Sequence, residues 1–426
     1  MRDTEAHKFS NGLQLILEKL PNSKSAGVAV GFPVGGRTEE TDVSGISHYL
    51  EHMIFKGTRT TQNVETTFEK LGARNNAMTD VDATIYVAEC PRKYSMRVLE
   101  LWLHLLSETS IELERLERER GVILSEYFIT EDNPDYLAEK TATLTLFKDH
   151  PLSTTVIGSE ETVKAITQPK MREYFRSFYS PSNTVIWVSG DLTMNELIDH
   201  VKSHEYWMRR VKGSAVRYET FHPHGPSTTE LRRPMKLLQL GLALSSPTDS
   251  AEERASLQIL GSMLSSGQSS ILRRRLILQA ELTDRLRTLV QSYKEAGMLF
   301  TTFATQPNNA SKVLKILSWT LSELREETYK FKEQFENARN NAIGQLTTNI
   351  DSPMMWRIFQ GTWETLRRGH CSWNELTSHL ETLNFKEFEE TVTEISKPER
   401  IALILIGDVG EGSAKNPRLQ RALNDF

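Results

Sequence analysis

Short apolar runs alternate with longer amphipathic stretches along the first half of the chain. The short runs are rich in aliphatic and β-branched residues and are bounded by turn residues, which is typical of β-strands. They predict strands at residues 13–17, 27–32, 84–88 and 184–189. The longer stretches predict helices at 46–55, 92–109 and 112–128, the first of them capped by Ser44.

The same order of elements returns after a break in this pattern. Residues 222–227 are polar, contain proline and lack periodicity, which indicates a linker within residues 213–233. Beyond the linker, the pattern predicts strands and a helix at 237–244, 251–264, 299–304 and 401–406, the second of these being the helix. A glycine-aspartate pair follows an apolar strand in both halves, as Gly190-Asp191 and Gly407-Asp408.

The first helix of each half indicates an internal duplication. Residues 48–53 (His-Tyr-Leu-Glu-His-Met) correspond to residues 258–263 (Gln-Ile-Leu-Gly-Ser-Met), with the apolar positions kept and the polar ones changed. We therefore predict an α+β fold of two homologous domains, each a mostly antiparallel β-sheet covered by helices. The predicted domains are residues 1–212 and 234–426, joined by the linker 213–233. A coincidental likeness between two strand–helix units is the alternative.

Composition narrows the class of protein. At 426 residues, 38% hydrophobic and 25% charged, the chain is a folded protein that is too long for one core. No apolar run approaches the roughly 20 residues that span a membrane, and the opening residues do not resemble a signal peptide. Cys90 and Cys371 are too few for a disulfide framework, and a net charge of -5 does not suggest a nucleic-acid or membrane partner. These features predict a cytoplasmic protein.

One helix carries the strongest chemical signal. His48 and His52 are four residues apart, so on a helix both imidazoles project from one face, as a shared metal ion requires. Glu51 lies on the neighbouring flank, where its carboxylate could reach a metal-bound water. The order His-x-x-Glu-His is the inverted form of a zinc peptidase motif. The alternative is a surface helix that carries these side chains without a metal.

A zinc site needs a third protein ligand, and the best candidates lie further along the chain. Glu119 and Glu126 are two helical turns apart and so share one face of a helix. The apolar residues 122–124 between them are expected to hold that helix on the core. Carboxylates on a charged helix are usually solvated, so the residues alone favour solvent for Glu119 and leave Glu126 open.

Three segments together resemble the pitrilysin/insulinase family of zinc peptidases. They are residues 47–58 (Ser-His-Tyr-Leu-Glu-His-Met-Ile-Phe-Lys-Gly-Thr), 76–79 (Asn-Ala-Met-Thr) and 119–126 (Glu-Arg-Gly-Val-Ile-Leu-Ser-Glu). The likeness points to the short branch of the family, which includes mitochondrial processing peptidase beta and bacterial heterodimeric proteases that mature peptides. Residues 183–192 and 401–409 also match strands that close the family's domains, so the likeness covers most of the chain.

The resemblance implies a role for each residue of the motifs. Zinc is the implied cofactor, with His48, His52 and Glu126 as its ligands. Glu51 is implied to be the general base that activates water, and Glu119 an auxiliary acidic residue that helps orient the site. The second domain is expected to lack metal ligands.

Asn76 and Ala77 are implied to lie on an edge strand that binds substrate. There a peptide would add as a further strand through main-chain hydrogen bonds, with sequence selectivity left to pockets. For Asn76, a polar residue beside a turn is an equally good interpretation of the sequence alone.

The second half departs from the pattern of family members that work alone. Such members carry an arginine and a tyrosine that hold the substrate, and those positions fall here on Ile277 and Asp284. Neither side chain can replace them, and the nearby Arg285 and Arg287 are out of register. The departure indicates a homologous, metal-free partner subunit that supplies the missing arginine and tyrosine. A weak, self-contained enzyme is the other interpretation.

The function predicted on this basis is that of a zinc-dependent metallo-endopeptidase which cleaves short unstructured peptides. A ribosomal precursor peptide, such as that of pyrroloquinoline quinone, is one candidate substrate. The chain would act as the catalytic subunit of a heterodimer. The alternative is a non-catalytic zinc-binding or structural subunit of a larger assembly.

Overall fold

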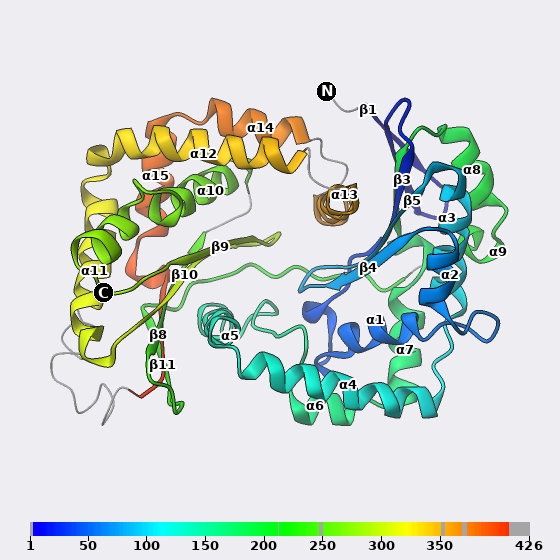
Figure 1. Ribbon diagram of the computed structural model, residues 1–426, viewed down its shortest axis with the longest axis horizontal. Coiled ribbons are helices and arrows are strands. Elements are labelled where there is room, and N and C mark those ends of the chain that lie inside the picture. Colours follow the sequence, from blue (N-terminus) through cyan, green and yellow to red (C-terminus); the bar gives the residue numbers. More distant parts are fainter. Residues whose placement is uncertain (1–2, 212, 247–249, 351–353, 369–372, 409–426) are drawn as a thin grey trace. The chain divides into compact units, whose positions relative to one another are not determined.

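The computed structural model describes residues 3–211, 213–246, 250–350, 354–368 and 373–408. Its strands form two sheets with helices packed against them (Figure 1). The strands are β1 (Asp3–Lys8), β2 (Gln14–Lys19), β3 (Ser25–Phe32), β4 (Arg74–Thr79), β5 (Thr84–Pro91), β6 (Val185–Gly190), β7 (Ser227–Leu231), β8 (Leu238–Ser246), β9 (Arg287–Ser292), β10 (Gly297–Thr305) and β11 (Ile401–Ile406). The helices are α1 (Ile46–Phe55), α2 (Val64–Lys70), α3 (Ser95–Glu108), α4 (Leu113–Glu131), α5 (Pro134–Leu146), α6 (Glu160–Ala165), α7 (Gln168–Phe178), α8 (Met194–Lys202), α9 (Glu205–Met208), α10 (Ala251–Ser265), α11 (Ala310–Glu326), α12 (Lys332–Ile350), α13 (Met354–Arg368), α14 (Trp373–Thr382) and α15 (Phe385–Ile395).

The first sheet has the strand order β1-β2-β6-β3-β5-β4. All neighbouring strands are antiparallel except β2 and β6, which run parallel. On β5, Ile85 and Val87 belong to the core beneath α13, whereas the ring of Tyr86 lies 5.6 Å from that of Trp102 on α3. Because successive strand residues point to opposite faces, α13 and α3 cover opposite faces of this sheet.

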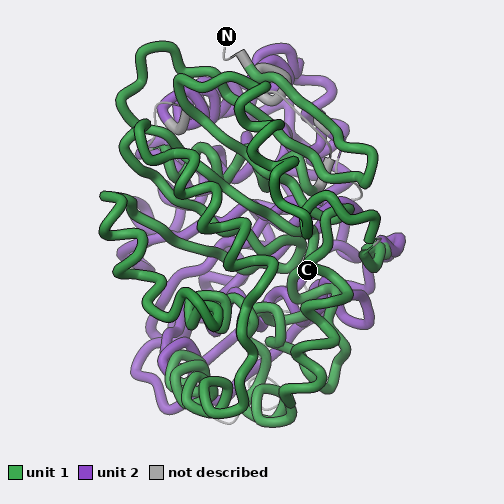
Figure 2. Tube along the Cα trace, turned by 90° about the vertical axis from the view of Figure 1, so that its right-hand side faces the viewer, with its two compact units in different colours: residues 1–128, 154–217, 349–372 green, residues 129–153, 218–348, 373–426 purple. Residues whose placement is uncertain are grey.

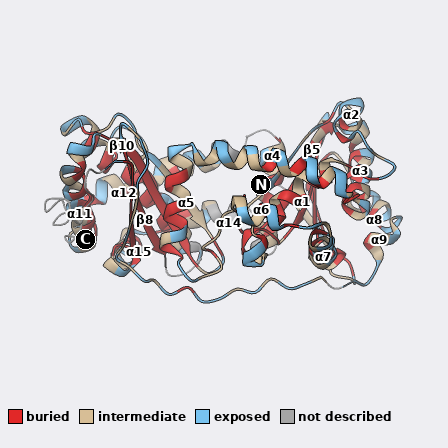
Figure 3. Cartoon of the chain, turned by 90° about the horizontal axis from the view of Figure 1, so that it is seen from below, coloured by how far each residue is buried: buried red, intermediate tan, exposed pale blue. Residues whose placement is uncertain are grey.

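The second sheet has the strand order β7-β11-β8-β10-β9, and β7 and β11 form its parallel pair. Helix α5 packs on β8 and β11, and α10 packs on β9 and β10. Every residue of β8 and β11 is buried, and Figure 3 shows β8 in red among helices that are partly exposed. The main core of the second half therefore lies between this sheet and its helices.

The two sheets repeat one topology once β1 is set aside. In each, a parallel pair is followed by three antiparallel strands, so that β2, β6, β3, β5 and β4 correspond to β7, β11, β8, β10 and β9. The prediction of two homologous α+β domains, each with a mostly antiparallel sheet, is confirmed.

The compact units of the chain are interleaved along the sequence (Figure 2). The first unit comprises residues 1–128, 154–217 and 349–372, and the second comprises 129–153, 218–348 and 373–426. Thus α5, from the first half of the sequence, packs on the second sheet, and α13, from the second half, packs on the first. The predicted boundaries 1–212, 213–233 and 234–426 describe contiguous halves, and they stay a prediction. The compact units differ from such halves because residues 129–153 belong to the second unit and residues 349–372 to the first.

The pattern located most of the buried elements to within a few residues, and missed the polar strands. Helix α1 has the predicted bounds, while β1, β4, β7 and β9 were not predicted from periodicity. These four strands are less buried than the central ones, and β4 alternates exposed and partly exposed residues. Cys90 is buried, whereas Cys371 and residues from 409 onward lie outside the described residues. Within the part of the chain that is described, no helix is both long and apolar enough to cross a membrane.

Candidate active site

Helix α1 begins at a backbone turn that a partly buried carboxylate stabilises. Gly45 precedes the helix with φ 95°, a left-handed conformation that glycine adopts without strain. Glu39 accepts hydrogen bonds from the backbone N–H groups of Gly45 and Ser47, at 2.7 and 2.8 Å. Burial raises the pKa of Glu39 to about 7, against the opposing effect of these hydrogen bonds. The predicted cap, Ser44, is therefore wrong: Glu39, six residues before Gly45 and eight before Ser47, accepts from these N–H groups instead.

The apolar face of α1 fixes the direction of its polar face. The buried face of the helix is formed by Ile46, Tyr49, Leu50, Met53 and Ile54. His48 and His52 are only partly buried, and their rings lie with centroids 4.7 Å apart. The predicted one-turn spacing thus brings both imidazoles together on one side of the helix.

Glu126 of α4 completes a three-ligand cluster with these histidines. Its Oε1 lies 3.7 Å from His48 Nε2, and its Oε2 lies 3.6 Å from His52 Nε2. One ligand atom from each of the three residues lies within 4.8 Å of the others. Two imidazoles and a carboxylate are a donor set that zinc uses at catalytic sites, where a fourth position stays open.

Glu119 holds His52 from behind. Its Oε1 lies 2.8 Å from His52 Nδ1, and its Oε2 lies 2.6 Å from Lys56 Nζ. Burial would raise the pKa of Glu119, but hydrogen bonds from His52 and Lys56 outweigh it and lower the pKa. The bond to Nδ1 leaves His52 Nε2 directed at the cluster, as a carboxylate behind a metal-binding histidine does. The solvated interpretation of Glu119 is therefore wrong, because its side chain is 6% exposed.

The two histidines differ in electrostatic environment. Burial lowers the pKa of His48 to about 4, with a further contribution from His52. Burial also acts to lower the pKa of His52, but the hydrogen bond to Glu119 and the charges of Glu51, Glu119 and Glu126 raise it overall. The carboxylates thus favour a positive charge at His52. A divalent metal ion would supply that charge in place of a proton on the ring.

Glu51 is oriented by the edge strand of the first sheet. Thr79, at the end of β4, donates a hydrogen bond of 2.6 Å from its Oγ1 to Glu51 Oε2. Burial raises the pKa of Glu51, while the hydrogen bond from Thr79 and the charge of His52 lower it. A carboxylate with a raised pKa that remains held in place is suited to accept a proton near neutral pH.

Polar anchors add to the buried apolar residues Leu116 and Ile123 in holding α4 in place. Of the predicted apolar contacts at 122–124, only Ile123 is buried, and Val122 is 50% exposed. Arg120 instead donates from Nη2 to Ile166 O at 2.9 Å, and Arg115 donates from Nη1 to Lys56 O at 2.7 Å. The second of these bonds ties α4 to the residue that ends α1, so the two ligand-bearing helices are joined.

Asn76 and Ala77 lie on β4, which is the outermost strand of the first sheet. Ala77 shares a face of the strand with Thr79, whereas Asn76 points to the other face and is exposed. Asn76 Oδ1 accepts a hydrogen bond of 2.9 Å from the backbone N–H of Ala77. The edge-strand position is as expected, and Asn76 is a strand residue and not a turn residue.

Two contributing residues were not singled out from the sequence. Lys56 lies four residues after His52, so the spacing that identified the histidines also placed Lys56 on the same face of α1. Thr79 belongs to the 76–79 segment, but its contact with Glu51 joins residues 28 positions apart. Helical spacing could have found Lys56, whereas Thr79 required the fold.

The positions at which an arginine and a tyrosine were expected lie in the second unit. Ile277 is in the π-helix Arg273–Gln279, and Asp284 is in the loop that follows. Arg285 lies 3.5 Å from Asp135, and Arg287 lies 3.4 Å from Glu139, both carboxylates belonging to α5. The two arginines near the expected position therefore contact acidic groups of α5.

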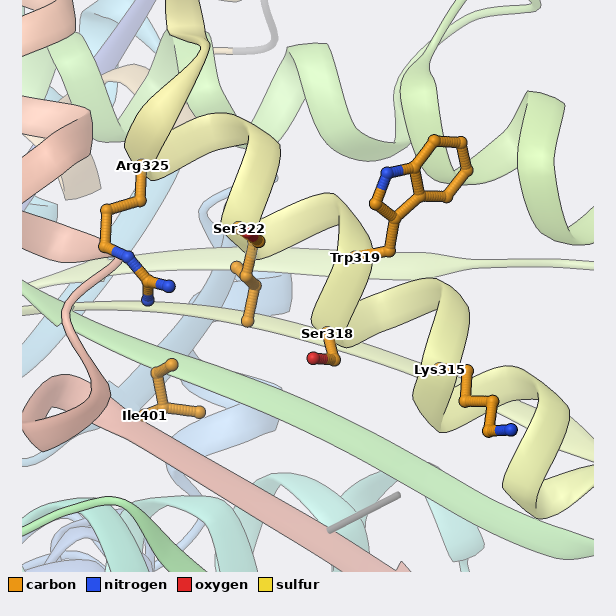
Figure 4. A pocket seen from close by; sticks show the side chains of 7 residues that line it. Lys315, Ser318, Trp319, Ser322, Arg325 and Ile401 are labelled. Carbon is orange, nitrogen blue, oxygen red and sulfur yellow. The ribbon is translucent and has the colours of Figure 1, made fainter. Parts of the chain in front are cut away.

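A surface pocket of about 320 Å³ on the second unit has a different character (Figure 4). It is lined mainly by residues of α11 and holds two cationic side chains, Lys315 and Arg325, together with Trp319. Its lining contains no histidine, cysteine or carboxylate. The pocket therefore offers none of the usual metal ligands, in contrast to the α1–α4 cluster.

Comparison with known proteins gives two family matches that follow one another along the chain. Residues 14–160 match the family described as Insulinase (Peptidase family M16). Residues 165–342 match the family described as Peptidase M16 inactive domain. The first match includes the whole of the α1–α4 cluster.

Relatives over most of the length carry related names. A Bacillus subtilis protein named uncharacterized zinc protease YmxG is 26% identical over 404 residues, which cover 94% of this chain and 97% of the relative. An Arabidopsis thaliana protein named probable mitochondrial-processing peptidase subunit beta is 26% identical over 365 residues, covering 82% and 68%. The crystal structure of a protease from Helicobacter pylori shares the fold with a TM-score of 0.86 at 19% identity, covering 95% of this chain and 99% of that one.

Proposed function

Because the chain belongs to peptidase family M16, the insulinase family, we propose that it is a zinc-dependent metallo-endopeptidase whose active site lies between α1 and α4. The observation that carries the proposal is the joint placement of a partly buried, oriented Glu51 and the three-ligand cluster of His48, His52 and Glu126. A ligand cluster alone would support metal binding. The added carboxylate, which the cluster does not need for charge or geometry, supports catalysis.

Zinc is the cofactor of this family, and relatives are named zinc proteases. The cluster fits a divalent cation: His48, His52 and Glu126 supply the donor set, and Glu119 and Glu126 outweigh the positive charge of Lys56. When bound, zinc lowers the pKa of a water ligand to about 7 and polarises the scissile carbonyl.

Glu51 is proposed to act as the general base. It would take a proton from the attacking water and pass it to the amine that leaves when the peptide bond breaks. Thr79 keeps one carboxylate oxygen engaged, so the other oxygen is the one that exchanges protons. Glu119 is proposed as a positioning residue, since it contacts His52 and Lys56 and sets the ring orientation of His52.

The proposed substrates are short, unstructured peptides. Strand β4 ends at Thr79, which contacts Glu51, so a peptide that paired with its outer edge would run toward the catalytic carboxylate. Ala77 would meet it through its backbone N–H, and the substrate would replace the internal bond between that N–H and Asn76 Oδ1. A precursor peptide such as that of pyrroloquinoline quinone belongs to this class of substrate.

A homologous, metal-free partner subunit is proposed to complete the enzyme. Ile277 and Asp284 stand where an arginine and a tyrosine would hold the substrate, and Arg285 and Arg287 contact α5 carboxylates. A relative named as the beta subunit of a mitochondrial-processing peptidase supports a subunit role. We place this assembly in the cytoplasm, on the basis of composition.

The experiment that tests the proposal compares the wild-type chain with Glu51→Gln, alone and with a co-expressed homologous chain. Zinc that survives dialysis is counted by mass spectrometry, and cleavage is followed with a quenched mixed-sequence peptide library. We expect Glu51→Gln to keep the wild-type zinc content and to lose activity by about 10²- to 10⁴-fold, the usual contribution of a general base. Glu114→Gln, which removes an exposed carboxylate of α4, is the matched control.

The outcomes separate the alternatives. Zinc with no cleavage in any combination would favour the non-catalytic subunit. Cleavage by the chain alone, lost in Glu51→Gln, would establish the peptidase and contradict the need for a partner.

A further inference from the structure

A second cluster of metal-ligand side chains lies in the first unit, on elements that the proposed active site does not use. It consists of Glu100 on α3, His200 on α8, and His204 immediately before α9. Helix α9 contacts both α3 and α8, and the three helices appear together in Figure 1. One ligand atom from each residue lies within 4.8 Å of the others, the same criterion that the α1–α4 cluster meets.

Both imidazoles of this cluster face one carboxylate oxygen. Glu100 Oε2 lies 3.2 Å from His200 Nε2 and 2.6 Å from His204 Nε2. Two donors bound at about 2.0 Å to one tetrahedral zinc are about 3.3 Å apart. The first distance already has this value. The second must lengthen by roughly 0.7 Å to reach that geometry, and the side chain of Glu100 is half-exposed and able to turn.

A hydrogen bond explains only part of the arrangement. The hydrogen bond between His204 Nε2 and Glu100 Oε2, at 2.6 Å, accounts for those two side chains. His200 Nε2 is buried from solvent and makes no hydrogen bond with any described residue, although it points at the same oxygen. A buried polar atom without a hydrogen bond is costly, and coordination of a metal ion would satisfy it.

The backbone that carries the ligands is held in place from several sides. Ser203 donates from Oγ to His200 O at 2.6 Å, between the two histidines. Trp207 is fully buried and donates from Nε1 to Leu103 O at 3.0 Å, which ties α9 to α3 close to Glu100. The ligands thus lie on fixed elements, and only the carboxylate needs to move, which is the condition for a preorganised site.

We propose that Glu100, His200 and His204 form a second divalent metal site, selective for zinc-class transition metals and separate from the His48–His52–Glu126 cluster. Two imidazoles suit zinc, copper and nickel better than calcium or magnesium, which prefer all-oxygen sites. Because His52 of the α1–α4 cluster is also held by Glu119 through Nδ1, we expect the second site to bind its metal more weakly and to exchange it. Its role is to clamp α3 to the α8–α9 segment, and it does not depend on peptidase activity.

The test uses the full chain with zinc chloride as the probe. Zinc per chain is measured by equilibrium dialysis and mass spectrometry, for the wild type and for His200→Ala/His204→Ala. We expect two zinc ions per wild-type chain and one in the double variant, with the tighter one retained. His222→Ala/His224→Ala, which removes two exposed histidines of the linker, is the matched control and should keep both.

A second measurement covers the case in which the double variant folds poorly. Glu100→Gln changes only a half-exposed side chain, and it should weaken the second zinc by 10-fold or more while leaving the first unchanged. In a His48→Ala/His52→Ala background, zinc should still raise the melting temperature, and Glu100→Gln should remove that rise. A wild-type chain that never binds more than one zinc, or a second zinc unaffected by Glu100→Gln, would overturn the proposal.

Discussion

The first helices of the two halves occupy equivalent places in their own units and differ in chemistry. Helix α1 contacts β4 and β5, and α10 contacts the corresponding strands β9 and β10. Each helix is also linked to a helix of 19 residues, α1 to α4 through His52 and Glu119, and α10 to α12 through Ser262 and Asn341. The duplication therefore repeats the scaffold, and a few side chains decide where a metal can bind.

The α10 positions that correspond to Glu51 and His52 carry the small residues Gly261 and Ser262. Gly261 stands where α1 has Glu51, and a Cβ atom there would lie 2.9 Å from Val290 and 3.0 Å from Leu299. Ser262 replaces His52 and accepts a hydrogen bond of 2.8 Å from Asn341 Nδ2. The cavity beside it, about 100 Å³, is lined by serines, amides and apolar groups and by no metal-binding side chain. Where α1 carries the proposed catalytic residues, α10 therefore makes a close approach to the sheet.

Converting α1 to the chemistry of α10 should abolish function and spare the fold. The variant His48→Gln/Glu51→Ala/His52→Ser keeps the buried face of the helix, so we expect a native circular dichroism spectrum. It should lose one tightly bound zinc ion per chain and all detectable peptidase activity, because ligands and base are removed together. Zinc counting and the peptide library assay check this, with His222→Gln/His224→Gln as control. Retained cleavage would show that the α1–α4 cluster is not the active site.

Removing Glu119 should weaken metal binding without removing a ligand. Glu119→Ala takes away the partner of His52 Nδ1, so we expect zinc affinity to fall about 10- to 100-fold, as for other residues behind metal ligands. Excess zinc should restore most of the activity, which would not occur for Glu51→Gln. Competition with a chelating dye measures the affinity, and Glu114→Ala on the same helix is the control. An unchanged zinc affinity would show that Glu119 does not support the metal site and only pairs with Lys56.

The contrast between the halves also separates what the sequence could predict from what it could not. Helical spacing placed His48, Glu51 and His52 on one face of a helix, because that face follows from a local period. The contacts that position this face did not follow from that local period. Thr79 approaches Glu51 only after the sheet has formed, and Glu39 rather than the adjacent Ser44 satisfies the start of α1.

Features of the fold that depend on local sequence were likewise predicted, and those that depend on long-range contacts were not. Apolar runs predicted the central strands and the duplicated order, since burial leaves a local pattern. The exchange of α5 and α13 between the halves was not predicted, because an amphipathic helix does not record which sheet it covers. Contacts such as that between Arg357 Nη2 and Glu18 Oε2, at 3.1 Å, join residues 339 positions apart.

The reverse graft, from α1 onto α10, should destabilise the second unit and create no site. Gln258→His/Gly261→Glu/Ser262→His forces a side chain at Gly261 against Val290 and Leu299, and overpacking of this kind costs about 1–3 kcal/mol. Urea unfolding measures the loss, and zinc content should not rise. Gly344→Glu is the control, since a Cβ atom at that helical glycine meets nothing within 4 Å. An added zinc ion with unchanged stability would show that α10 can accommodate the metal ligands of α1.

The smallest expected effect concerns the contact between the edge strand and the base. Thr79→Val removes a hydrogen bond that lowers the pKa of Glu51, so burial should raise that pKa further. Because the base acts when ionised, the acidic limb of kcat/KM should move to higher pH, with a loss of less than about tenfold at neutral pH. Zinc content should stay unchanged, and Thr79→Ser, which keeps the hydroxyl, should restore the wild-type profile. If both variants lowered activity equally at every pH, Thr79 would serve to fix β4 and not to tune the base.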